Sequence, residues 1–245
     1  MNRFRPHEVR ELEVFKDILI AVEGYLPLDF IVGVFQHMRD NPKGFDTEWL
    51  QRAVATGKRV AEAHNLSASD TGVLLTAVML LETGRKFIGV DRREGSVAFG
   101  ISFINKVIPG FFTDDEIKTI SYCLRYNRER FRRGVDGSFV LLVGEVAMLA
   151  DVVYRDLASV VVNYVREHPT ANADPNEGGS TGKWHENVVI ELERSYGPEG
   201  FAWQTITPAT KKHFRFEINA FQNMVMGTPG IRETLTQNYK RIYSR

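Results

Sequence analysis

The sequence predicts an all-α protein, and three observations support that prediction. Apolar residues recur at the three- and four-residue spacing of a helix along most of the chain. Serine, threonine and aspartate precede several of these segments, where their side chains can accept hydrogen bonds from the first helical turn. The β-branched run Val160–Val162 lies between helical flanks and does not alternate with polar residues as a strand would.

Helices are predicted in order along the first two thirds of the chain, each ended by glycine, proline or a polar break. Thr113 stands three residues before Glu116, which is the spacing of a capping box. The predicted helical ranges are Val9–Leu19, Asp29–Met38, Thr47–His64, Val73–Leu81, Ser96–Val107, Ile117–Arg130 and Phe139–Val165.

The last third of the chain begins with a break that is rich in asparagine, aspartate, proline and glycine, Ala171–Gly182. We expect this segment to be a flexible loop. Beyond it, helices are predicted near His185–Tyr196, Thr210–Met226 and Pro229–Tyr243. The expected organisation is a single all-α domain over residues 1–245, with a core at about 47–160, the loop at 171–182 and a C-terminal helical extension at 183–245.

The composition is that of a globular chain without net charge. Hydrophobic residues make up 43% of the 245 residues, and 31 basic side chains balance 31 acidic ones. Any attraction to nucleic acid or membrane must therefore be local. The single cysteine, Cys123, excludes an internal disulfide and a multi-cysteine metal site, and we expect it to be a buried core residue.

No segment predicts a signal peptide or a membrane helix. Residues 1–13 hold six charged side chains and no apolar run. The longest apolar stretch, Val73–Leu81, is far shorter than the roughly 18 residues that span a bilayer. We expect a soluble cytoplasmic protein with no membrane partner, and a homo-oligomer remains open.

Three segments in the middle of the chain carry a family resemblance. Thr56–Asp70 includes the end of the predicted helix that reaches His64, followed by Leu66 and Asp70. Val78–Leu81 is an apolar run followed by Glu-Thr-Gly-Arg, and Gly144–Asp151 lies in a predicted helix and ends in aspartate. In this order they resemble the HD-domain superfamily, a group of all-α metal-dependent phosphohydrolases. The resemblance implies an HD-like helical bundle with extra N- and C-terminal helices.

The family's metal ligands are not retained in this sequence. The resemblance implies histidine and aspartate ligands that hold divalent metals and activate water. The aligned positions carry Thr56, Leu81, Glu82, Ser96, Tyr126 and Asn127, with only Asp151 matching. We therefore expect no catalytic residue and no cofactor, with Leu81 in the core. An alternative is an active phosphohydrolase in which Glu82 and Asp151 bind Mg²⁺ or Mn²⁺ with solvent ligands.

Positive charge is concentrated in residues 84–134, where eleven basic side chains stand against six acidic ones, a local charge of +5. Arginine predominates, and its planar fork suits phosphate, while Tyr126 and Phe131 could stack on a base. The resemblance places Arg85 and Arg125–Arg128 beside the family's metal pocket. The candidate phosphate-binding residues are Arg85, Lys86, Arg125, Arg128 and Arg132.

The function expected from these residues is that of a pseudoenzyme with an Arg-rich binding surface. Its ligand would be a nucleotide, a nucleic acid or a protein partner. Two further alternatives remain open. The arginines can form a solvated face paired with Glu129, Asp114 or Asp115, or the protein can be a purely structural or protein-interaction module.

Overall fold

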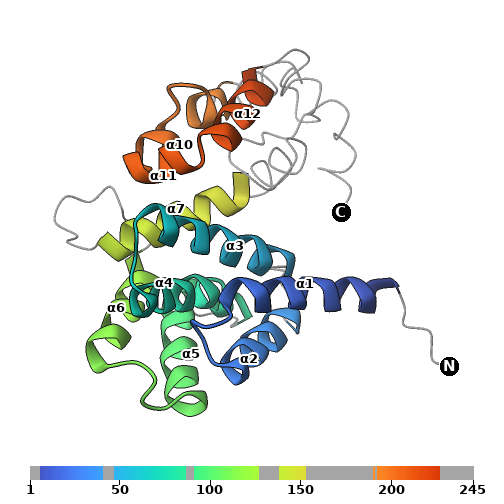
Figure 1. Ribbon diagram of the computed structural model, residues 1–245, viewed down its shortest axis with the longest axis vertical. Helices are drawn as coiled ribbons and strands as arrows, with labels where there is room; N and C mark the ends of the chain where they lie inside the picture. The colour runs from blue at the N-terminus through green and yellow to red at the C-terminus, as the bar shows by residue number, and fades with distance from the viewer. Residues whose placement is uncertain are drawn as a thin grey trace, which may run out of the picture. The chain divides into compact units, whose positions relative to one another are not determined.

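The computed structural model describes residues 6–40, 47–86, 91–126, 138–152, 190 and 192–226. Within these ranges every regular element is a helix and no strand occurs, which confirms the predicted all-α class (Figure 1). The chain divides into two compact units, Met1–Ala150 and Asp151–Arg245. The expectation of a single domain stays a prediction, because a division by contacts does not say whether the two units fold independently.

In its described residues, the first unit contains the helices α1 to α7 and the short 3₁₀ helix η1. Their bounds are α1 Pro6–Val22, α2 Leu28–Arg39, α3 Thr47–Ala63, α4 Ala68–Leu80, η1 Thr83–Lys86, α5 Arg92–Val107, α6 Asp114–Tyr126 and α7 Ser138–Val152, the last reaching two residues into the second unit.

Helix α4 forms the centre of the first unit. All ten of its residues from Thr71 to Leu80 are buried, so the helix has no solvent-facing side. Helices α3 and α6 pack against it, and α1 packs on α3 in turn. A helix that is apolar all round is stable only in the interior, which is where the chain places it. Leu81 directly follows α4 and is 6% exposed, which confirms its expected place in the core.

Side-chain caps set the starts of three helices in this unit. Ser67 Oγ accepts a hydrogen bond from the amide of Asp70 at the start of α4. Thr113 and Glu116 bond reciprocally before α6, which confirms the predicted capping box. Helix α5 begins at Arg92, four residues before the predicted start at Ser96. The prediction was wrong there because Asp91 caps the helix through its Oδ1, ahead of the first buried residues.

Among its described residues, the second unit contains the helices α10 (Phe201–Gln204), α11 (Pro208–His213) and α12 (Arg215–Met226), and residues 192–196 are also helical. The predicted helix Thr210–Met226 is wrong in its bounds: it begins earlier, after the Thr207 cap, and is divided at Phe214. Helix α10 was not predicted. The core of this unit is aromatic, with Tyr196, Trp203 and Phe221 in edge contacts at centroid distances of 5.8 to 6.3 Å.

Several predicted elements lie outside the described residues. These are the loop 171–182, the helix 229–243, residues 127–130 and 153–165 of two predicted helices, and residues 185–189 and 191 of the helix predicted near 185–196, whose described residues 190 and 192–196 are helical. Among the helices that the structure describes, none is long and apolar enough to cross a membrane.

Candidate functional site

The segment that follows α4 is fixed against α5 by one buried serine. Ser96 Oγ donates a hydrogen bond to the backbone oxygen of Leu81 (3.0 Å) and accepts one from the amide of Gly84 (2.9 Å). Ser96 is completely buried. These two bonds satisfy backbone groups that the end of a helix leaves free, and they hold η1 on the first turns of α5.

His37 of α2 holds the same segment from another side. Its Nε2 lies 3.0 Å from the backbone oxygen of Thr83, so this nitrogen is the donor. The His37 ring stacks on Phe99 of α5 with centroids 3.9 Å apart, and Phe99 stacks on Phe103 at 5.2 Å. Helices α2 and α5 are close here because Gly33 has no side chain: a Cβ would lie 2.2 Å from the Phe103 ring.

Arg125, at the end of α6, forms a two-bond ion pair with Glu94 in the first turn of α5. The Nε–Oε1 distance is 2.8 Å and the Nη2–Oε2 distance is 3.1 Å. Hydrogen bonding to Arg125 lowers the pKa of Glu94, and hydrogen bonding to Glu94 raises the pKa of Arg125. Both side chains remain about half exposed, at 41% for Arg125 and 52% for Glu94, so the pair is accessible from solvent.

A second contact joins the same two helix ends. Arg93 Nη1 donates to the backbone oxygen of Arg125 at 3.5 Å, so the start of α5 lies beside the end of α6. Because Ser96 also ties η1 to α5, three segments meet in this place. We call it the basic junction and define it by Arg85 and Lys86 of η1, Arg92 and Arg93 of α5, and Arg125 of α6.

The structure places the backbones of three of the five predicted phosphate-binding residues. The backbones of Arg85 and Lys86 lie in η1, which packs against α5, and Arg125 lies at the neighbouring end of α6. Arg128 and Arg132 lie outside the described residues. Arg125 is paired, as the alternative of a solvated face expects, but with Glu94 and not with Asp114 or Asp115. Asp115 pairs with Lys118 instead, at 2.8 Å.

Apart from Glu82 and Asp151, the residues that the resemblance aligns with metal ligands offer a metal no carboxylate or imidazole. Thr56 is fully buried and offers a hydroxyl, Leu81 offers no donor, and the Ser96 hydroxyl is already used by two backbone groups. Tyr126 ends α6, and Asn127 lies outside the described residues. Within the part of the chain that the structure describes, no three His, Cys, Asp or Glu side chains lie close enough to share a metal ion.

Glu82 and Asp151 were the carboxylates kept for an alternative metal site. Glu82 is 2% exposed, directly after α4, and Asp151 is half-buried near the end of α7. Glu82 belongs to the first compact unit and Asp151 to the second, and the structure does not define the relative placement of the two units. The metal-dependent alternative therefore receives no support from this pair.

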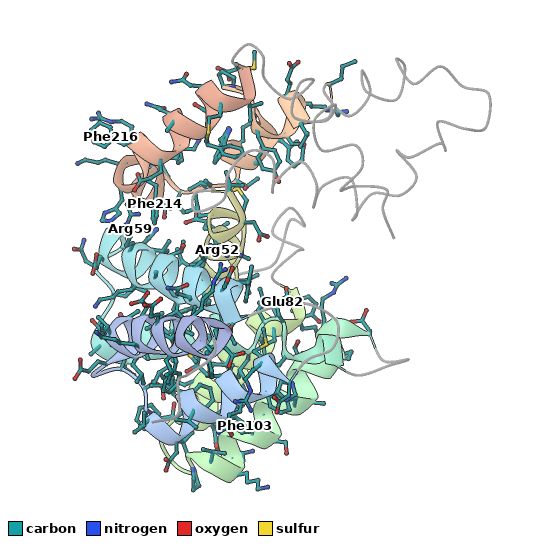
Figure 2. All side chains as sticks on the ribbon, turned by 90° about the vertical axis from the view of Figure 1, so that its right-hand side faces the viewer. Arg52, Arg59, Glu82, Phe103, Phe214 and Phe216 are labelled. Atoms are coloured by element: carbon teal, nitrogen blue, oxygen red, sulfur yellow. The ribbon has the colours of Figure 1, made fainter. Side chains whose placement is uncertain are left out.

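Sequence reasoning missed a buried carboxyl group in α7. Glu145 is fully buried, and its Oε2 lies 4.0 Å from Nε2 of His64, which follows α3. It also missed Arg52, whose Nε is buried one turn before Thr56 on α3 (Figure 2). His64 and Glu145 are 81 residues apart in sequence, so no local pattern could have indicated their contact.

Comparisons with protein-family models, curated proteins and solved structures found no match for this chain. The resemblance to the HD-domain superfamily is therefore neither supported nor contradicted by them and stays a prediction.

Proposed function

We propose that this protein binds a phosphate-bearing ligand, a nucleotide or a nucleic acid, at the basic junction, and that it does not hydrolyse it. On this proposal the chain is a degenerate relative of the HD-domain phosphohydrolases that has kept a place for phosphate and lost the metal centre.

The observation that carries the proposal is the meeting of η1, the start of α5 and the end of α6. Five basic residues come from these three segments, of which the end of α6 lies about 30 residues further along the chain than the other two. The acidic residues of the same segments are Glu82, which is buried, Asp91, which caps α5, and Glu94, which pairs with Arg125. By sequence these segments hold five basic residues against three acidic ones, a net charge of 5 − 3 = +2 that would attract an anion.

The Glu94–Arg125 pair suggests how a phosphate would bind. Arginine presents the same planar fork to phosphate as to carboxylate, so a phosphate oxygen pair can replace the Glu94 oxygens. The Glu94–Arg125 pair is exposed to solvent, and surface ion pairs are weak, so a phosphate can displace Glu94 from Arg125 at little cost in free energy. Glu94 therefore acts as a competitor that lowers affinity for the ligand, and removing its charge should increase affinity.

The absence of hydrolysis follows from the aligned positions. In-line attack on a phosphoryl group requires a metal or another group that activates water. Ser96 is committed to the backbone of Leu81 and Gly84, and Leu81 lies in the core, so neither supplies that chemistry. The proposal expects binding with no release of inorganic phosphate.

A titration of the full chain tests the proposal. Labelled single-stranded RNA, single-stranded DNA and a nucleoside triphosphate are each titrated with protein at low salt and again at high salt. We expect saturable binding to at least one probe, weaker at high salt because counterions compete. Flat titrations for all three probes would contradict the proposal and favour a protein-binding role.

A further inference from the structure

Helices α11 and α12 together form one amphipathic face that continues across the break at Phe214. The amide of Phe214 bonds to the oxygen of Thr210, and the amide of Ile218 bonds to the oxygen of Phe214, both as in a helix. The buried residues follow helical spacing and point into the second unit; they are Thr210, Phe214, Ile218, Phe221 and Val225.

The opposite face of α11–α12 is exposed along its whole length. Its residues come as neighbouring pairs at four-residue intervals, so they lie along one side. From the start of the face to its end they are Lys211 and Lys212, Arg215 and Phe216, Asn219 and Ala220, and Asn223 and Met224. We call these eight residues the α12 face.

Positive charge gathers at the beginning of the α12 face. Lys211, Lys212 and Arg215 are exposed, and none of them forms an ion pair with a residue that the structure describes. The one acidic residue between Pro208 and Met226 is Glu217, which is half-buried and lies off this face. The face therefore presents uncompensated positive charge to an anion.

An aromatic ring lies directly beside this charge. Phe216 is 75% exposed, which makes it the most exposed of the large apolar side chains described, while its neighbour Phe214 is completely buried (Figure 2). The guanidinium carbon of Arg215 lies 4.9 Å from the centre of the Phe216 ring. An arginine held against an exposed ring is the arrangement on which an unpaired base can stack while its phosphate meets a cation.

We propose that the α12 face binds single-stranded nucleic acid. Phe216 stacks on an unpaired base, Lys211, Lys212 and Arg215 contact the phosphates, and the amides of Asn219 and Asn223 offer hydrogen bonds to the same strand. A membrane-lying helix would place its cations and its apolar residues on opposite faces. Here cations, amides and the ring share one face, which favours a nucleic-acid strand over a lipid surface.

This surface is separate from the basic junction. It belongs to the second compact unit, shares no residue with the first surface, and includes an aromatic contact that a phosphate-only ligand would not use. A variant in one unit therefore tests the surface in that unit alone. A negative result for the basic junction does not contradict the proposal for the α12 face, and the reverse also holds.

The experiment measures binding of the full chain to labelled oligouridine and oligothymidine of twelve nucleotides by fluorescence anisotropy over a salt series. The stacking variant is Phe216→Ala, and its control is Phe201→Ala, an exposed phenylalanine of α10. We expect Phe216→Ala to weaken binding about tenfold, as loss of one stacked base does, with an unchanged salt slope. The control should bind as the natural protein does.

The charge variant is Lys211→Ala with Lys212→Ala, and its control removes two exposed lysines elsewhere, Lys16 and Lys106. We expect the slope of log affinity against log salt to become shallower by about 1.4, since each phosphate contact contributes about 0.7 for single strands.

Equal binding by Phe216→Ala and Phe201→Ala would overturn the proposal. So would binding to phosphatidylserine vesicles without binding to either oligonucleotide. Circular dichroism confirms that each variant is folded.

Discussion

Ser96 and Leu81 are joined by a buried hydrogen bond, in which the serine Oγ donates to the leucine backbone oxygen over 3.0 Å. The same Oγ accepts the amide of Gly84. The resemblance to the HD-domain superfamily implies a histidine ligand at the position of Ser96, and in this chain the serine there fixes the backbone. The consequence is that η1, with Arg85 and Lys86, is held beside the first turn of α5.

Replacing Ser96 by alanine should destabilise the first unit. The change leaves a buried backbone oxygen and a buried amide without their partner, which costs about 1–3 kcal/mol of unfolding free energy. Ser102→Ala is the matched control, because Ser102 lies on the same helix and is exposed. Urea denaturation measures both. A Ser96→Ala variant as stable as Ser102→Ala would contradict this role.

Restoring the family's dipeptide with Leu81→His and Glu82→Asp should not create a phosphohydrolase. Of the other positions that the resemblance aligns with metal ligands only Asp151 carries a carboxylate, while Thr56 is buried and the Ser96 hydroxyl is bonded to the backbone, so the new pair lacks most of its partner ligands. An imidazole placed in the core without partners should destabilise the fold by about 1–3 kcal/mol. A phosphate-release assay with Mg²⁺ and Mn²⁺ checks the first expectation and urea denaturation the second. Metal-dependent hydrolysis by the double variant would refute the degenerate site.

Cys123 should be unreactive in the native protein. The side chain is fully buried, and burial raises the pKa of its thiol to about 12. In the unfolded chain the thiol has a pKa of about 8.5. The stability that the buried, neutral thiol contributes is therefore fully present below that pH, and it is lost as the pH rises toward 12. A thiol reagent at pH 8 should react only in denaturant. Rapid labelling without denaturant would contradict the buried placement.

Replacing Arg128 and Arg132 by alanine should weaken phosphate binding. Both follow Arg125 closely in sequence, and 128 and 132 share a face wherever the chain is helical. We expect a loss of affinity for the probe bound by the natural protein, with a nearly unchanged melting temperature, since arginine is rarely buried unpaired. Thermal melts and anisotropy measure the two effects. A double variant that binds the probe as tightly as the natural protein would show that Arg128 and Arg132 do not contribute to phosphate binding.

Much of the fold could be predicted because its signals are local. Helix α4 is marked by the Ser67 cap and by the apolar stretch Val73–Leu81, in which Thr76 is the one polar residue, and the start of α6 is marked by the spacing of Thr113 and Glu116. The burial of Leu81 and Cys123 follows from their neighbours in the same helical pattern. These features depend on residues within one or two turns of each other, which a sequence displays directly.

The parts that could not be predicted depend on contacts between distant residues. Arg125 pairs with Glu94, 31 positions away, although the sequence offers nearer acidic residues in Asp114 and Asp115. The Glu145–His64 contact joins two helices that no periodicity relates. The division at Phe214 arises from a residue that continues the helical hydrogen bonds but turns its backbone at ψ 17°.

The measurement that tests the phosphate-binding account most directly compares Glu94→Gln with the natural protein. Glutamine keeps the shape of Glu94 and removes the charge that occupies Arg125, so the arginine becomes available to phosphate. Asp115→Asn is the control, because it frees Lys118 at the other end of α6 in the same way. The account predicts that Glu94→Gln binds the phosphate probe severalfold more tightly, with a steeper salt dependence, while Asp115→Asn binds as the natural protein does. Unchanged or weaker binding by Glu94→Gln would contradict it.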